Sequence, residues 1–359
     1  MKVLFIVRST LFSVRGGDTV QVEETASHLR LLGVEVSIRK SSEHIDYSGY
    51  RLIHFFNIIR PADMLVHIRK SKKPFVVSTI LVDYSFYDKY HRRGFSGSLF
   101  RLLPANGIEY CKTLYRALRR NDALPSPEYI WKGQRQSIRL ILRKAAMVLV
   151  NTVEEYGSLV KAYRVTPPFA IIPNGINKKL FNNQAAVPKE KDMVLCAARI
   201  EGIKNQQQLI RALNNSPFRL VLVGNAAPNQ QRYYQRCKKS AAANVSFVGQ
   251  LSQAELLHYY KRAQVHILPS WFEVCGLSSL EAAAMGCNVV ISNNGYANSY
   301  FGEEAVYCDP ASPQSIRAAV EKAAARPQNE ALQIRIREQY NWEEAARKTF
   351  SIYQQITGA

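Results

Sequence analysis

Glu273-Val-Cys-Gly-Leu-Ser-Ser-Leu-Glu281 places two carboxylates eight positions apart, with a glycine and two serines between them. The preceding residues 265–270 have the apolar pattern of a short buried strand that ends in a turn. Ser278-x-x-Glu281 has the form of a capping box, which predicts a helix with Glu281 in its first turn. Free N–H groups at such a helix start can bind anions. Taken alone, the carboxylates are equally well explained as a helix cap and a solvated loop residue.

Strand-like and helical patterns alternate on both sides of this stretch, which predicts two parallel sheets covered by helices. The strand patterns fall at 2–8, 34–38, 52–56, 74–80, 147–151, 193–198, 218–223, 245–248, 265–268 and 288–292. We therefore expect an α/β chain of two Rossmann-like, doubly wound domains facing across a cleft that holds the ligand. The expected domains are 1–168 and 169–341, with a final helix in 342–359 packing back on the first domain.

The composition is that of a soluble protein with 359 residues, which is long enough for two cores. The chain contains no apolar run of about 18 residues, so a membrane-spanning helix is not expected. Its first residues have the pattern of a strand rather than of a signal peptide. Disulfides and structural zinc are not expected either, and a reducing cytoplasm fits the scattered cysteines. These are Cys111, Cys196, Cys237, Cys275, Cys287 and Cys308.

The net charge of +20 is concentrated in the first half, where residues 1–178 hold 28 Lys and Arg against 14 Asp and Glu. Residues 85–145 interleave this positive charge with Phe, Tyr and Trp. Such a segment is either a solvated basic face or a surface for an anionic membrane or acceptor. A nucleic-acid-binding module has only the charge in its favour, because no binding motif accompanies it.

Three positions in the first half are candidates for ligand contacts. Arg15-Gly16-Gly17 follows the first strand but lacks the three spaced glycines of a dinucleotide fingerprint, and alone it predicts a tight turn with positive φ. Asp83 follows the strand at 74–80, on the edge where open α/β sheets bind ligands. His54 ends the preceding strand, where a structural role is the more common one.

A set of motifs in the second half resembles glycosyltransferase family 4. The motifs are Ile171-Ile-Pro-Asn-Gly-Ile176, Ala198-Arg-Ile200 with Lys204-Asn205, Val221-Leu-Val-Gly224, Val248-Gly249, and the Glu273–Glu281 stretch with Gly286. The resemblance extends over essentially the whole chain, is strongest from 171 to 310 and is weakest from 81 to 145. It implies the GT-B fold and transfer of a sugar from a nucleotide-sugar with retention at the anomeric carbon.

The resemblance also implies roles for individual residues. Arg199 and Lys204 resemble the diphosphate-binding pair, since negative charge grows on the leaving phosphate and must be met by cations and N–H groups. Glu273 would face the transferred sugar, and Glu281 would accept bonds from the ribose hydroxyls. The remaining expected donor contacts are Gly16, Gly17, Asn174, the base pocket at Gly249, Gln250 and Leu251, and the helix start at Leu277, Ser278 and Ser279.

The chain departs from the family pattern at a few positions. Many members have a histidine after the strand that here covers 74–80, whereas this chain reads Leu81-Val82-Asp83. Either Asp83 replaces that contact to sugar or acceptor, or the contact is missing. Val274 and Cys275 also differ from the usual residues, which leaves the donor sugar open.

These observations favour a cytoplasmic, retaining glycosyltransferase, peripheral on the inner membrane face, that uses a UDP- or GDP-linked sugar. Its acceptor would be lipid-linked or a polysaccharide in cell-surface glycan biosynthesis. No metal and no cofactor are expected, and no nucleic-acid partner. The alternatives are a catalytically degenerate GT-B nucleotide-binding scaffold and a GT-B sugar-nucleotide epimerase.

Overall fold

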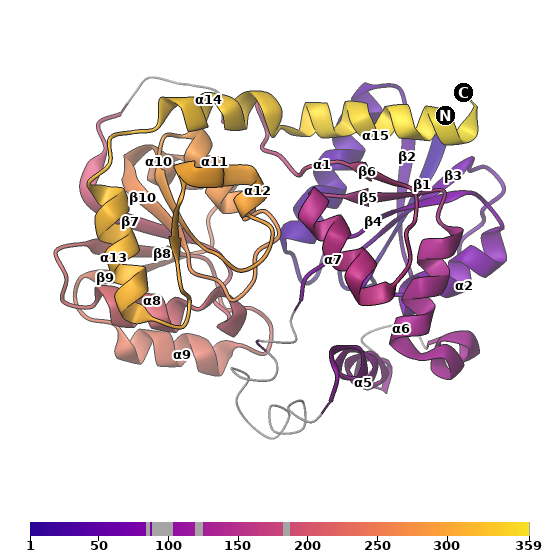
Figure 1. Ribbon diagram of the computed structural model, residues 1–359, viewed down its shortest axis with the longest axis horizontal. Coiled ribbons are helices and arrows are strands. Elements are labelled where there is room, and N and C mark those ends of the chain that lie inside the picture. Colours follow the sequence, from indigo (N-terminus) through magenta and orange to yellow (C-terminus); the bar gives the residue numbers. More distant parts are fainter. Residues whose placement is uncertain (84–86, 88–102, 119–124, 182–186, 359) are drawn as a thin grey trace. The chain divides into compact units, whose positions relative to one another are not determined.

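The computed structural model describes residues 1–83, 87, 103–118, 125–181 and 187–358 (Figure 1). The chain divides into two compact units, one of Met1–Asn174 with Trp342–Ala359 and one of Gly175–Asn341. Part of the basic 85–145 segment, at residues 85, 86, 88–102 and 119–124, lies outside the described residues.

The first unit contains a six-stranded parallel sheet in the order β2-β1-β3-β4-β5-β6. The chain runs from β1 to β2 on one side and then returns to β3 on the other side of β1. This reversal makes the carboxyl ends of β1 and β3 a topological switch point, where ligands bind in such sheets. The strands are β1 Lys2–Val7, β2 Glu35–Lys40, β3 Leu52–Phe56, β4 Phe75–Ser78, β5 Met147–Val150 and β6 Phe169–Ile171.

Helices cover this sheet, among them the last helix of the chain (Figure 1). The described helices of the unit are α1 Gly17–Leu31, α2 Ala62–Ser71, α5 Ala105–Leu118, α6 Pro127–Lys144, α7 Val153–Tyr163 and α15 Trp342–Thr357. α15 buries Ala346, Ile352 and Tyr353 in the same apolar cluster as Val22 of α1. The chain end is thus part of the core of the first unit.

The sequence placed the boundary of the first domain at residue 168, and this boundary is wrong by a few residues. β6 pairs with β5 in parallel, with Val148 opposite Phe169, and the Ile172 N–H donates to the Val150 carbonyl at 2.8 Å. Residues 169–174 therefore complete the first sheet, because their backbone groups find partners there. The second unit begins at Gly175.

The second unit has its own six-stranded parallel sheet in the order β12-β11-β10-β7-β8-β9, with a switch point between β7 and β10. Its strands are β7 Glu190–Ala197, β8 Arg219–Val223, β9 Val245–Gly249, β10 Ala263–Leu268, β11 Asn288–Ser292 and β12 Val306–Cys308. Its α-helices are α8 Gln206–Leu213, α9 Gln231–Ser240, α10 Gln253–Arg262, α11 Leu277–Ala284, α12 Asn298–Phe301, α13 Pro313–Ala324 and α14 Glu330–Gln339. The short 3-10 helices η1 Gly202–Lys204 and η2 Gly302–Glu304 complete the unit. None of the described helices of either unit is long and apolar enough to cross a membrane.

His54 is a structural residue of the first unit. Its ring is fully buried in β3, where it bonds the Tyr353 hydroxyl at 2.5 Å and the Ser78 hydroxyl at 2.8 Å. It thereby ties α15 to two adjacent strands. Burial lowers the pKa of His54 from its ordinary 6.5 to about 3.

This pKa predicts an acid-sensitive fold. The unfolded chain binds the His54 proton more tightly, so the stabilisation present above pH 6.5 is lost as the pH falls toward 3. Between pH 7 and 5 the loss should be about 2 kcal/mol. Urea unfolding of wild type and His54→Gln at both pH values measures this loss. Glutamine does not titrate, so between pH 7 and 5 the variant should lose less stability than wild type, by about 2 kcal/mol. Equal losses in both proteins would contradict the assignment.

Candidate functional site

Two residues expected at the reacting centre touch each other in the second unit. Lys204 lies at the end of η1, after β7, and Glu273 lies in the loop after β10. The Lys204 ammonium contacts the Glu273 carboxylate at 2.5 Å, and the Ser270 hydroxyl donates to the same oxygen at 2.6 Å. Because β7 and β10 are neighbours, this pair sits at the switch point of the sheet.

The pair is buried to different degrees on its two sides. The Glu273 side chain is 8% exposed and that of Lys204 is 22% exposed. Burial would lower the pKa of Lys204, but the Glu273 carboxylate outweighs it and raises this pKa above its usual 10.5. The ammonium is therefore charged at neutral pH. An ammonium has three donors, so one bound to Glu273 can still meet a phosphate.

Hydrogen bonds to backbone carbonyls hold the loops of this site in place. Asn205 adopts a left-handed conformation (φ 61°), and its side-chain amide donates to the carbonyls of Pro269 (3.1 Å) and Pro310 (2.7 Å). The Trp271 N–H donates to the Ile203 carbonyl at 2.8 Å. The loops after β7, β10 and β12 are thus joined next to the Lys204–Glu273 pair.

The backbone of Glu273 is clamped by the loop after β11. Its N–H donates to the Asn294 carbonyl at 3.1 Å, and its carbonyl accepts from the Tyr296 N–H at 2.8 Å. Gly295, between them, has φ 111° and lies so close that a β-carbon would come within 2.0 Å of the Glu273 carbonyl oxygen. Only glycine fits at this position.

Arg199 extends the positive charge of this edge. It follows β7, its side chain is 39% exposed, and its guanidinium donates to Glu201 at 2.8 Å. Gln206 bonds the Arg199 carbonyl at 2.9 Å and fixes the backbone there. Arg199 and Lys204 thus flank one short loop on the same edge of the sheet.

The capping box expected at Ser278 and Glu281 is wrong. α11 begins two residues earlier, at Leu277, because Gly276 takes the cap position with φ 66° and accepts from the Ser279 N–H at 2.7 Å. The Ser279 side chain is buried and contacts His266 at 3.3 Å. The Ser279 N–H is therefore used within the helix, and the N–H groups of Leu277 and Ser278 are the candidates for an anion.

Glu281 lies on the next turn of α11, beside the expected base pocket. Its carboxylate accepts from the Tyr260 hydroxyl at 2.9 Å and from the Gln253 amide at 3.2 Å. Gln253 is the first residue of α10, directly after the loop that contains Gln250 and Leu251. The structure thus brings Glu281 together with this loop. Gly249 ends β9 with φ 86° and accepts from the Gly224 N–H at 2.7 Å.

The remaining candidates belong to the first unit. Gly16 precedes α1 and is extended, with φ −158°, so the tight turn of positive φ is wrong at this residue. Arg8 shapes the loop before Gly17 by bonding Asp18 at 2.6 Å and the Val14 carbonyl at 2.8 Å. Asp83 is exposed and lies beyond the end of β4. Asn174 is buried, and it is the last residue of the segment Met1–Asn174 that forms most of this unit.

A buried carboxylate that is not among the predicted site residues holds the segment leading to Asp83. Glu155 is fully buried in α7 and accepts bonds from the Thr79 hydroxyl (2.5 Å), the Leu81 N–H (2.8 Å) and the Asn151 N–H (2.6 Å). Ile80 between these contacts has φ 45°, an unfavourable conformation for a β-branched residue. The carboxylate fixes this strained turn at the end of β4.

Glu155→Gln should destabilise the first unit by about 2–3 kcal/mol, because an amide N–H₂ group would face N–H and O–H donors in a buried place. Equilibrium unfolding in urea measures the loss. Glu154→Gln is the matched control, since Glu154 is exposed on the same turn. Equal stability of the two variants would contradict the clamp.

In the described part of the chain, no group of three or more His, Cys, Asp or Glu side chains is arranged to hold a metal ion. Besides Glu155, the site residues that we did not predict are Ser270, Gly295, Tyr260 and Gln253. Each of these four residues contacts Glu273 or Glu281, and none of them belongs to a sequence motif that would have indicated this contact.

Residues 177–349 match the family model described as "Glycosyl transferases group 1", so this part of the chain is similar to that family. A glycogen synthase of Mycobacterium tuberculosis is 29% identical over 196 residues, covering 51% of this chain and 47% of that protein. A D-inositol 3-phosphate glycosyltransferase of Streptomyces scabiei is 29% identical over 199 residues, covering 49% and 44%. The chain thus spans about half the length of these relatives.

Two solved structures resemble the fold over the whole chain. Sucrose-phosphate synthase from Thermosynechococcus elongatus has a TM-score of 0.77 at 18% identity, covering 100% of both chains. Anabaena HepE in complex with UDP has a TM-score of 0.69 at 14% identity, covering 99% of this chain and 100% of HepE. The predicted fold class is confirmed: the chain has the GT-B fold, with two Rossmann-like domains.

Proposed function

We propose that this chain is a retaining glycosyltransferase that moves a sugar from a UDP- or GDP-linked donor to a lipid-linked or polysaccharide acceptor. The observation that carries the proposal is the Lys204–Glu273 contact at the switch point of a sheet within the glycosyl transferases group 1 segment. HepE, which shares the fold, was solved with UDP, which favours a uridine nucleotide.

The proposed chemistry places negative charge on the departing phosphate and positive charge on the sugar. Lys204, Arg199 and the N–H groups at the start of α11 would stabilise the phosphate charge. Glu273 would hold the sugar hydroxyls and stabilise the positive charge beside it. The leaving phosphate would take the acceptor proton on the same face, so no second carboxylate and no metal is part of this proposal.

The first unit would contribute Gly16 and Gly17 near the donor, and Asp83 near the sugar or acceptor. Glu281 would bind the ribose, because its carboxylate lies beside the loop of Gln250 and Leu251. We further propose that the enzyme acts at the cytoplasmic face of a membrane, where its acceptor is anchored.

Binding of UDP and GDP to wild type, Arg199→Ala and Glu281→Ala tests the donor site. Loss of one charge-assisted contact should weaken the preferred nucleotide about tenfold or more, as measured by calorimetry. Product analysis with the matching nucleotide-sugar then tests transfer. Binding without turnover would indicate a degenerate scaffold, and a new nucleotide-sugar would indicate an epimerase. No nucleotide binding would overturn the proposal.

A further inference from the structure

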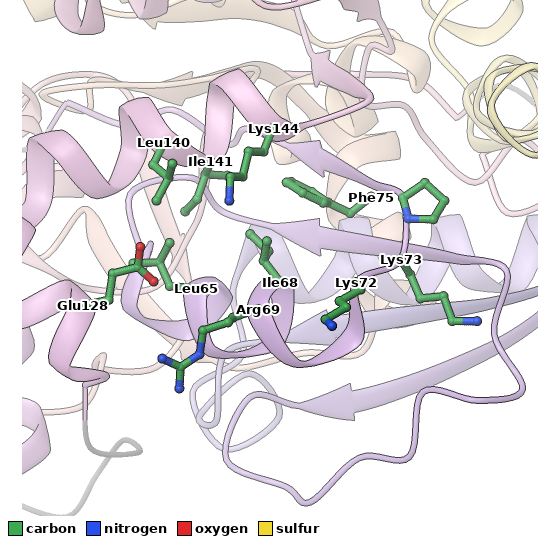
Figure 2. Close-up of a pocket in the computed structure, with 11 residues that line it drawn as sticks. Leu65, Ile68, Arg69, Lys72, Lys73, Phe75, Glu128, Leu140, Ile141 and Lys144 are labelled. Atoms are coloured by element: carbon green, nitrogen blue, oxygen red, sulfur yellow. The ribbon is translucent and has the colours of Figure 1, made fainter.

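Two adjoining hollows lie on the first unit, the larger lined by α2, residues 72–75 and α6, and the smaller by α6. The larger, of ≈ 490 Å³, has an apolar floor that includes Leu65, Ile68, Phe75 and Ile141. Figure 2 shows these side chains turned toward one another, with Arg69, Lys72, Lys73 and Lys144 around them. The smaller, of ≈ 330 Å³, shares Leu140 with the first.

The charge around these hollows is almost entirely positive. The smaller hollow adds two cations, Lys132 and Arg143, to the four of the larger one, whereas Glu128 is the single acidic residue among their lining residues. Within the described residues, none of these six cations forms a salt bridge. We call this region the α2–α6 surface. It consists of Arg69, Lys72, Lys73, Trp131, Lys132, Arg143 and Lys144.

Trp131 is the most exposed large apolar side chain of this surface, at 91%. It lies on α6 next to the half-exposed Ile130, just before the helix is interrupted at Gly133 (φ 68°). A tryptophan exposed to this degree is uncommon on a soluble surface. Trp beside Lys and Arg is typical of a side chain that inserts at a membrane interface.

One end of the α2–α6 surface lies at the amino edge of the sheet, opposite the candidate ligand contacts of this unit. Phe75 is the first residue of β4, and Lys144 precedes β5. Asp83 and the glycine loop instead follow the carboxyl ends of β4 and β1. Trp131 and Lys132 lie near the other end of α6, just before Gln134, whose amide donates to the Ile59 carbonyl beyond the carboxyl end of β3 at 2.7 Å. The surface therefore extends from the amino edge of the sheet toward its carboxyl edge.

We propose that the α2–α6 surface docks the chain on an anionic lipid bilayer. The six cations meet phosphate headgroups, Trp131 enters the interface, and the hollow with the apolar floor receives part of one lipid. Cations beside an exposed indole and an apolar floor match a bilayer, which offers charge and hydrocarbon in adjacent layers. The docking itself is inferred from this surface alone. Its purpose, which is to bring the enzyme to a lipid-linked acceptor, rests on the proposed function.

Tryptophan fluorescence of the full chain provides the test, because the other two tryptophans, Trp271 and Trp342, are only 6% and 2% exposed. The probes are phosphatidylcholine vesicles with and without phosphatidylglycerol, some carrying brominated acyl chains. We expect binding to the anionic vesicles alone, weakened by salt, with a blue shift and bromine quenching. Trp131→Phe should lose both signals, while sedimentation still detects its binding.

Charge reversal tests the cations. Lys72→Glu with Lys144→Glu should weaken vesicle binding at least about tenfold. Lys322→Glu with Lys348→Glu changes the net charge equally at exposed sites elsewhere and should bind as wild type does. UDP binding, measured beside each variant, should stay unchanged, so a failed donor site and a failed docking surface give different results.

Three outcomes would overturn the proposal. The first is that the chain binds anionic and neutral vesicles equally well. The second is that both double substitutions weaken vesicle binding equally. The third is that the chain binds vesicles while the emission of Trp131 remains that of a water-exposed indole. Displacement of the vesicles by single-stranded RNA that quenches Trp131 more strongly than lipid does would assign this surface to nucleic acid instead.

Discussion

Lys204→Ala is expected to lower the rate of sugar transfer at least about a hundredfold. The ammonium would stabilise the charge that grows on the leaving phosphate, and removal of one preorganised donor of this kind usually has an effect of that size. It should also weaken UDP binding about tenfold to a hundredfold, since the charge-assisted contact exists in the ground state as well. Calorimetry and initial rates measure the two effects separately.

Glu273→Gln should lower the rate of sugar transfer but have little effect on nucleotide binding. The amide keeps the size of the side chain and a bond to Ser270, but it removes the negative charge that would face the sugar. We expect UDP to bind nearly as in wild type while the rate falls by at least about a hundredfold. A variant that loses nucleotide affinity and rate equally would place Glu273 at the phosphates instead.

The double variant shows whether the two residues act as one unit. Lys204→Ala alone leaves a carboxylate that is 8% exposed without its cation, so part of its loss should be recovered when Glu273→Gln is added. Lys239→Ala, an exposed lysine of α9, is the control. A rate within about threefold of wild type for Lys204→Ala would contradict the role of the ammonium.

Much of the fold could be predicted, because buried parallel strands are short apolar runs and the helices between them have a different period. The prediction failed where the local signal is short. β12 has only three residues, and β6 was assigned to the second unit although its backbone pairs with β5. α6 was not predicted because its polar and aromatic residues resemble a basic surface segment.

The residues of the site were predicted from sequence motifs, but only the structure shows how these residues lie relative to one another. Lys204 and Glu273 are distant in sequence and meet only because the sheet reverses between β7 and β10. The capping box failed because Gly276, in a left-handed conformation, starts α11 earlier than the Ser-x-x-Glu pattern indicates. The Asn205 side-chain amide and the backbone of Gly295 contact the backbone of other loops, and a local sequence pattern does not show which loops will be neighbours.

Gly295→Ala should have the largest effect on the stability of the second unit, at least about 3 kcal/mol. The added β-carbon would lie 2.0 Å from the Glu273 carbonyl oxygen and 2.8 Å from its nitrogen, and φ 111° is itself unfavourable for alanine. Both neighbouring atoms are backbone, so neither a rotamer change nor a small side-chain shift relieves the overlap. Urea unfolding measures the loss.

Gly286→Ala is the matched control in the same unit. Gly286 also has a positive φ, 79°, but its β-carbon would meet nothing closer than 3.5 Å. It should therefore show the backbone strain alone, about 1–2 kcal/mol. Folded Gly295→Ala should in addition lose transfer activity, because relief of the overlap moves the Glu273 backbone away from the position that brings its carboxylate to Lys204. If both variants unfold at the same urea concentration and remain equally active, the loop after β11 does not position Glu273.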